Sequence, residues 1–196
     1  NIMLDKKVHL LPKIGGGIYI LPNLITTGNL FFGFFSIVKS MQQDFVWAAA
    51  AVFLAAIFDI LDGRVARLTK GVSDFGVQYD SLCDLVSFGL APSFLMYQYS
   101  LHHYGRIGWV LCFIYLSCGA LRLARFNVQS LVGKSSSDFN GLPIPMAACL
   151  IASLVLFREE IREYSGTSLG LWETIQTLIL REDYIAYFFM WLAFCV

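Results

Sequence analysis

The sequence predicts an all-α integral membrane protein with six transmembrane helices and a short N-terminal interfacial segment. Hydrophobic residues make up 57% of its 196 residues and charged residues 14%, whereas an average soluble domain is roughly 45–50% apolar and about 25% charged. The hydrophobic residues number about 112, close to the ~120 that six helices of ~20 residues require. The mean hydropathy of +0.65 agrees. With a net charge of 0, the composition excludes a soluble globular domain, a disordered chain and a nucleic-acid-binding arm.

The chain divides into a basic juxtamembrane segment, residues 1–17, and a six-helix membrane domain, residues 18–196. The segment holds three lysines and a run of three glycines, so we expect it to lie at the membrane surface. The first apolar run is too long for a signal peptide and lacks a cleavage site, so we expect a retained helix. The six apolar runs cover 18–38, 45–61 (continuing as a helix toward Arg67), 76–99, 107–125, 143–157 and 184–196.

The stretch between the fifth and sixth runs is polar from Arg158 to Glu163 and amphipathic around Leu169–Leu180. We expect the amphipathic part to lie on the membrane surface. The sixth run is still apolar at Val196, and we expect it to continue further.

The distribution of lysine and arginine predicts the orientation in the membrane. With the N-terminus in the cytoplasm, nine of the 14 basic residues fall on the cytoplasmic side and five on the other. We therefore expect a protein of the cell membrane with a cytoplasmic N-terminus. The ends of the second and fourth helices and the start of the third then meet at the cytoplasmic face.

Four aspartates lie in or beside the second and third apolar runs, where an ionised carboxylate is costly without a partner. Asp59 and Asp62 share one face of a helix, and so do Asp80 and Asp84. A short loop joins the two helices, so the four carboxylates can converge near the cytoplasmic face. Two divalent cations would neutralise them, and hard oxygen ligands favour Mg²⁺, Mn²⁺ or Ca²⁺. The alternative is a set of helix-capping or structural aspartates.

Two glycines accompany these aspartates. Gly63 follows Asp62, and Gly76 lies one helical turn before Asp80. Both remove a side chain where a bulky anionic group would have to approach. Two metal ions beside such a group can act as a clamp for phosphoryl displacement.

The same residues form a longer motif. It runs Asp59-x-x-Asp62-Gly63-x-x-Ala66-Arg67, then eight residues, then Gly76-x-x-x-Asp80-x-x-x-Asp84. This motif resembles the signature of the CDP-alcohol phosphotransferases at every position. The resemblance implies the six-helix membrane fold of that family, usually a homodimer. It also implies transfer of a phosphoalcohol group with release of CMP, assisted by two divalent ions, which makes residues 18–196 the catalytic domain.

The resemblance further implies roles for individual residues. Asp59, Asp62 and Asp80 are expected to be metal ligands. Asp84 is expected to be both a ligand of the second metal and the base for the acceptor hydroxyl. The residues expected to cradle the cytidine diphosphate are Thr26, Gly63, Ala66, Arg67, Ser73 and Gly76.

Three further stretches bear on the acceptor alcohol: Leu21-Pro22-Asn23-Leu24-Ile25-Thr26-x-x-Asn29, residues 119–127 (GALRLARFN) and residues 139–145 (FNGLPIP). Together they resemble the membrane-embedded phosphatidylserine synthases of bacteria and archaea over about residues 20–157. In the related phosphatidylglycerophosphate synthases an arginine is usual where this chain has Asn29. The resemblance implies CDP-diacylglycerol as donor and L-serine as acceptor.

Serine carries a carboxylate, which a guanidinium and hydrogen-bond donors can hold. Arg122, Arg125 and Asn127 lie at the cytoplasmic end of the fourth predicted helix and are the candidates. The alternative for the two arginines is that they are topological anchors at the interface. A related enzyme with an inositol phosphate or glycerol phosphate acceptor, a divalent-cation transporter and a purely structural membrane scaffold remain as other readings of the whole chain.

Overall fold

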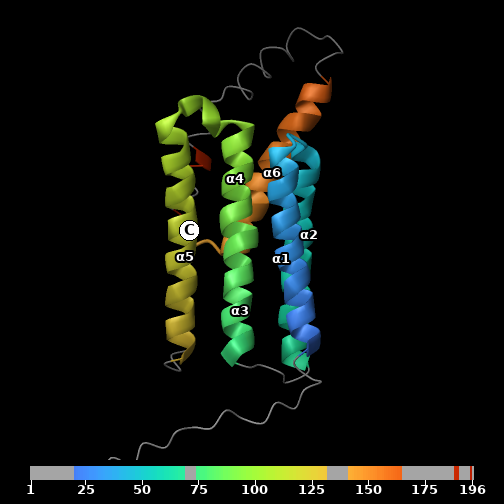
Figure 1. Ribbon diagram of the computed structural model, residues 1–196, viewed down its shortest axis with the longest axis vertical. Helices are drawn as coiled ribbons and strands as arrows, with labels where there is room; N and C mark the ends of the chain where they lie inside the picture. The colour runs from blue at the N-terminus through green and yellow to red at the C-terminus, as the bar shows by residue number, and fades with distance from the viewer. Residues whose placement is uncertain (1–19, 69–73, 132–140, 165–187, 190–194, 196) are drawn as a thin grey trace, which may run out of the picture.

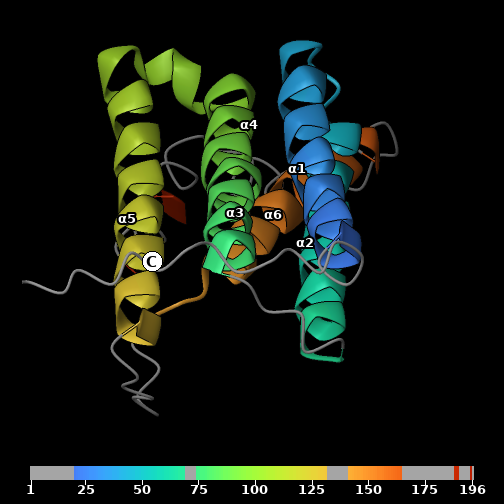
Figure 2. The same cartoon turned by 60° about the horizontal axis from the view of Figure 1, so that its bottom comes forward.

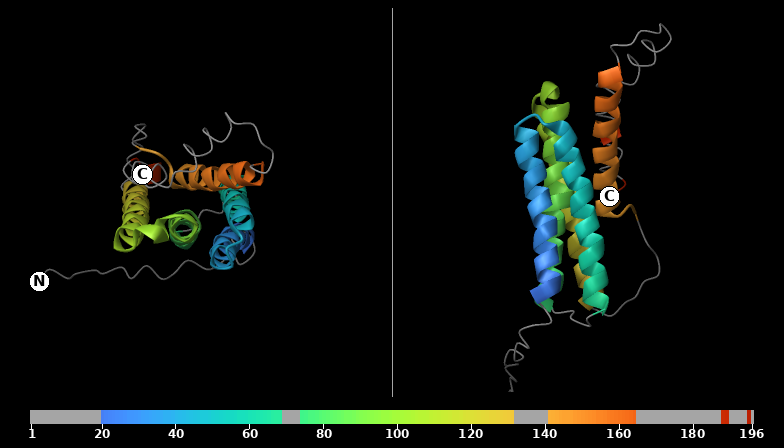
Figure 3. Two further views of the ribbon diagram at one scale, coloured as in Figure 1. Left: turned by 90° about the horizontal axis from the view of Figure 1, so that it is seen from above. Right: turned by 90° about the vertical axis from the view of Figure 1, so that its right-hand side faces the viewer.

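The computed structural model describes residues 20–68, 74–131, 141–164, 188–189 and 195, and the secondary structure within these ranges is helical. Its elements are α1 (Ile20–Met41), α2 (Phe45–Leu68), α3 (Asp74–Asp84), the π-helical η1 (Leu85–Leu90), α4 (Ala91–Tyr99), the 3₁₀-helical η2 (Leu101–Tyr104), α5 (Arg106–Leu131) and α6 (Ile144–Tyr164). Figure 1 shows α3 and α4 stacked end to end in one column, with α5 on one side and the α1–α2 pair on the other. The slanted α6 packs behind against α2 and α4 (Figures 1 and 3).

Helices α1 and α2 form a tight antiparallel hairpin. The turn between them places Gln43 at a φ of 60°, and a salt bridge of 3.0 Å joins Lys39 to Asp44 beside it. Farther along, the buried Ser36 hydroxyl donates to the carbonyl of Ala48 at 2.8 Å. Small residues on α2 let the two backbones approach closely enough for this contact.

The column made of α3, η1 and α4 changes from α-helical to π-helical in its middle, and the sequence explains why. Pro92 has no N–H, so it cannot donate to the carbonyl of Phe88 four residues earlier. The hydroxyl of Tyr115 on α5 donates to that carbonyl instead, at 3.0 Å. Just before the proline, the Ala91 N–H bonds to Val86 in the wider π-helical pattern. Such π-helical segments often mark functional sites, and this one begins directly after Asp84.

Three described helices are long and apolar enough to cross a membrane: Leu21–Met41, Phe45–Leu68 and Arg106–Gln129. They correspond to the first, second and fourth predicted runs. The third predicted run is the continuous column of α3, η1 and α4, and the fifth corresponds to α6. Helix α6 continues to Tyr164, so the polar residues after position 157 belong to it. The predicted surface segments 1–17 and 169–180, and all of the sixth run except residues 188, 189 and 195, lie outside the described residues.

The core lies between α2, α4 and α6. Val52, Leu95 and Ile151, one from each of these helices, are fully buried. Large apolar side chains also cover the outside of the bundle, with Phe31 on α1 59% exposed and Trp109 on α5 54% exposed. Outward-facing apolar side chains on helices long enough to cross a membrane are suited to lipid.

Candidate active site

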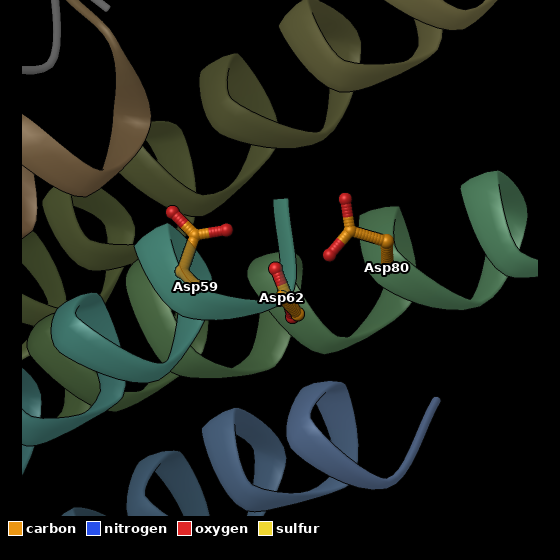
Figure 4. Close-up of side chains that lie close together, drawn as sticks. All are labelled: Asp59, Asp62 and Asp80. Carbon is orange, nitrogen blue, oxygen red and sulfur yellow. The ribbon is translucent and has the colours of Figure 1, made fainter. Parts of the chain in front are cut away.

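The candidate site lies at one end of the bundle, where α2 ends and α1 and α3 begin (Figures 1 and 2). Asp59 and Asp62 come from the last three turns of α2, and Asp80 comes from α3. One carboxylate oxygen from each lies within 4.8 Å of the other two. Figure 4 shows the three side chains gathered in the space between the two helices. Sequence spacing predicted this convergence, because each pair lies on one helical face.

The electrostatics of this group are unusual for a helical bundle in a membrane. Asp62 is only 4% exposed. Within the described ranges, Asp62 Oδ2 and Asp80 Oδ1 are buried and have no hydrogen-bond partner. The ion pairs found among the described residues are elsewhere. A cation stabilises carboxylate oxygens that are buried without donors, and an all-oxygen donor set fits hard divalent ions such as Mg²⁺ or Mn²⁺.

Asp84 borders the trio from the next turn of α3. Its side chain interacts with Asp59, and its Oδ1 accepts a hydrogen bond of 3.0 Å from Asn29 Nδ2. The four predicted aspartates are therefore neighbours, but they fall into a compact group of three with Asp84 at its edge. Asn29 contributes from α1, a third helix.

Thr26 joins the site from the same helix as Asn29. It is 5% exposed, and its Oγ1 interacts with Asp62 and donates to the carbonyl of Pro22 at 3.1 Å. One residue farther along, the hydroxyls of Thr27 and Tyr79 share a hydrogen bond of 2.9 Å that ties α1 to α3. Helix α1 therefore contributes polar side chains next to the aspartates.

The residues predicted to cradle a diphosphate lie around the end of α2. A Cβ atom added to Gly63 would meet only the Arg67 Nη2 atom, at 4.0 Å, so the space beside this glycine is open. The exposed Arg67 donates from Nε to the Gly63 carbonyl at 2.9 Å. Ala66 on α2 and Gly76 on α3 are half-buried. Ser73 lies outside the described residues.

The three predicted serine-binding residues on α5 differ in their surroundings. The Arg122 guanidinium donates to the carbonyls of Gly141 and Leu142, just before α6 begins. Arg125 is exposed. Asn127 Nδ2 donates to Ser81 Oγ at 3.0 Å. Two of the three therefore connect α5 to neighbouring segments of the bundle, and Asn127 does so beside Asp80.

Comparison with known proteins decides the family. Residues 19–195 match the family described as CDP-alcohol phosphatidyltransferase. The chain belongs to this family.

Several relatives within the family are named for serine-containing lipids or for transfer to serine. The chain is 42% identical over 151 residues to a CDP-diacylglycerol–serine O-phosphatidyltransferase of Helicobacter pylori strain J99, covering 77% of this chain and 63% of that protein. It is 37% identical over 132 residues to the enzyme of the same name from Bacillus subtilis, covering 67% and 73%. It is 41% identical over 157 residues to an archaetidylserine synthase of Methanothermobacter thermautotrophicus, covering 79% and 63%. The chain thus spans under two thirds of the length of the Helicobacter relative.

In this chain, the structure adds contacts that the motifs did not supply. The sequence predicts that polar residues inside this apolar run, Asn29 among them, face protein or ligand, but it does not indicate which group Asn29 contacts. Its bond to Asp84 and the Thr27–Tyr79 bond both cross between helices more than 50 residues apart. The available signal was the presence of several polar residues inside an apolar run, which lipid disfavours.

Proposed function

We propose that this chain transfers the phosphatidyl group of CDP-diacylglycerol to the hydroxyl of L-serine and releases CMP. The observation that carries the proposal is the group of three aspartates between α2 and α3, one buried and two half-buried, whose oxygens lie within 4.8 Å of one another. Family membership supports the reaction class. The names of relatives at 33–45% identity support the donor and the acceptor.

The aspartates have distinct roles in this proposal. Asp59, Asp62 and Asp80 hold two divalent cations, with Asp84 as a further ligand of the second. When bound, these Mg²⁺ or Mn²⁺ ions neutralise the diphosphate and stabilise the charge that develops on the leaving CMP. The chain itself contributes the fixed geometry of the carboxylates, which come from two antiparallel helices.

The proposed chemistry is a displacement at phosphorus. Asp84 takes the proton of the serine hydroxyl, and the serine oxygen forms a bond to the phosphorus that carries diacylglycerol. The bond from that phosphorus to the CMP oxygen breaks, and the electron pair leaves with CMP. General-base assistance of this kind contributes typically 10²–10⁴-fold to a rate.

The donor's diphosphate is placed by the end of α2 and the start of α3. The open space beside Gly63 allows an anionic group to approach the backbone, and Arg67 offers a guanidinium to phosphate oxygens. Thr26, Ala66, Ser73 and Gly76 complete the proposed cytidine diphosphate cradle. The exposed apolar faces of α1 and α5 suit the acyl chains of a lipid donor that enters sideways.

The acceptor is proposed to bind at the end of α5. Arg122 and Arg125 offer positive charge for the serine carboxylate, and Asn127 lies beside α3 through its bond to Ser81. The basic residues predict that this end of the bundle faces the cytoplasm, which is where a free amino acid would arrive. We further propose a cell-membrane protein with a cytoplasmic N-terminus that works as a homodimer.

A CMP-release assay with a panel of acceptors tests the proposal. The purified chain in lipid nanodiscs is supplied with CDP-diacylglycerol, Mg²⁺ or Mn²⁺, and either serine, glycerol phosphate, inositol phosphate or inositol. We expect CMP release only with serine, with phosphatidylserine as the lipid product. Release with another acceptor would assign a different alcohol, and cation flux across vesicles without CMP release would instead indicate transport.

A further inference from the structure

Asn29 occupies a position that polar side chains rarely occupy. It lies inside α1 and is fully buried. Its Nδ2 donates a hydrogen bond of 3.0 Å to Asp84 Oδ1 on α3. A carboxylate that is to act on a ligand must be held in one rotamer, and a buried amide from another helix can do that.

The backbone around this contact is also fixed. Ser87, one turn after Asp84, donates from Oγ to the Asn29 carbonyl at 3.0 Å. One turn after Asn29, a Cβ atom added to Gly33 would lie only 2.3 Å from Ser87 Oγ. The glycine therefore permits the close approach of α1 to η1. The bond between Asn29 and Asp84 is therefore supported by a second contact, from the Ser87 side chain to the Asn29 main chain.

The oxygen of the Asn29 side-chain amide lacks a comparable hydrogen bond. In the described part of the chain, Asn29 Oδ1 is buried without a hydrogen-bond donor. An unsatisfied buried carbonyl lowers stability, and a leucine of similar size would avoid that loss. The amide is therefore poorly explained as a device for folding, and its use lies in the group that it does contact, Asp84.

We propose that Asn29 is a positioning residue for Asp84. By holding Oδ1, it directs Oδ2 of the same carboxylate toward the cations and the acceptor hydroxyl. The inference rests on the proposed two-metal function and adds a residue from α1 to it. Partners that orient metal-binding carboxylates typically contribute 10–100-fold in metal affinity or activity.

The test measures Mn²⁺ binding directly, so it does not depend on turnover. The full chain in nanodiscs is titrated with Mn²⁺ and free ion is followed by electron paramagnetic resonance, for wild type, Asn29→Leu and Asn29→Ala. We expect the apparent affinity for at least one ion to fall about 10-fold in both variants. Two variants are used so that poor folding of one does not leave the question open.

A matched control and a coupling test separate positioning from general damage. Ser36→Ala removes another buried α1 hydrogen bond, to the Ala48 carbonyl far from the aspartates, and should leave Mn²⁺ affinity unchanged. In an Asp84→Ala background, Asn29→Leu should cause no further loss, because there is no carboxylate to position. Unchanged Mn²⁺ affinity in the folded Asn29 variants, or the same loss without Asp84, would overturn the proposal.

The same preparations distinguish this inference from the proposed reaction. Wild-type chain that binds Mn²⁺ but releases no CMP with serine contradicts the reaction, while the Asn29 titrations still decide the positioning role. Where serine does support turnover, Asn29→Leu should lower kcat about 10-fold or more and leave the KM for CDP-diacylglycerol within about twofold. A change confined to that KM would contradict a role through Asp84.

Discussion

The two ends of the bundle handle charge in opposite ways. At the α1–α2 turn, Lys39 and Asp44 pair at 3.0 Å, and the buried Arg158 of α6 lies over the Tyr99 ring at 5.3 Å. At the other end, Asp59, Asp62 and Asp80 face one another, and no ion pair in the described ranges reaches them. At the α1–α2 turn, side chains of the same protein interact with the charged groups. At the aspartate site, we expect bound cations to balance the negative charge.

Removing divalent ions should have the largest effect. EDTA should abolish CMP release, and added Mg²⁺ or Mn²⁺ should restore it, because several kcal/mol of charge stabilisation depend on the ions. Asp80→Ala should lower activity by about 10³-fold or more at saturating Mg²⁺, while Asp44→Asn at the opposite end should retain it. Full turnover in a metal-free preparation would show that the aspartates at this end do not need divalent ions for activity.

Replacing the proposed base should come next. Asp84→Asn keeps the size of the side chain and its hydrogen bond from Asn29 but cannot take a proton. We expect kcat to fall by about 10²–10⁴-fold, with CDP-diacylglycerol still bound, as measured by steady-state kinetics and a binding assay with labelled donor. If kcat stays near the wild-type value, Asp84 is not the base.

The arginines of α5 should produce a smaller and more selective effect. Arg125→Ala should raise the KM for serine about 10-fold, the scale of one charge-assisted hydrogen bond of ~1.5–3 kcal/mol, and leave the KM for CDP-diacylglycerol nearly unchanged. The serine carboxylate carries its charge in the ground and transition states alike, so kcat should change little.

Arg122→Ala should raise the serine KM similarly, but it should also lower the melting temperature. The same guanidinium holds the carbonyls of Gly141 and Leu142 at the start of α6. Kinetics and thermal unfolding of the two variants separate these contributions. If neither variant changes the serine KM, the arginines act only as interfacial anchors, and serine loses its main chemical support within this chain.

The smallest effect should come from changing the Lys39–Asp44 salt bridge at the α1–α2 turn. Lys39 and Asp44 are both partly exposed, with side chains 25% and 34% accessible, and such a pair contributes about 1 kcal/mol or less. Lys39→Met should therefore shift thermal unfolding only slightly and leave CMP release unchanged. A loss of activity in this variant would show that the two ends are not independent.

Much of the fold was predictable, because apolar runs and helical spacing are local properties of the sequence. The apolar runs at 18–38 and 45–61 overlap most of α1 and α2. The spacing of Asp59, Asp62 and Asp80 predicted that their carboxylates would converge. Helix ends were less predictable. The sequence ended the fifth apolar run at 157 and left the charged residues from Arg158 onward outside it, but α6 continues to Tyr164. Arg158 is buried against an aromatic ring, and that contact depends on tertiary packing.

The rest of the site depends on contacts between helices distant in sequence. Pro92 leaves the Phe88 carbonyl without its usual donor by a local rule, but no local pattern indicates that Tyr115 on another helix would bind it. Nor does one indicate that η1 would begin just after Asp84. The Asn29–Asp84 bond requires the register of α1 against α3, which Gly33 and Ser87 fix through a close approach. The backbone partners of Arg122 likewise depend on where the chain enters α6.

The stoichiometry of Mn²⁺ binding tests the central claim most directly. Equilibrium titration of the full chain in nanodiscs, followed by electron paramagnetic resonance, should show two ions bound per chain in wild type and in Asp44→Asn. Asp80→Ala should bind fewer ions or bind them at least about 10-fold more weakly. If wild type binds no Mn²⁺, or if Asp80→Ala binds it as wild type does, the aspartates at this end do not obtain their missing positive charge from metal ions, and the account is contradicted.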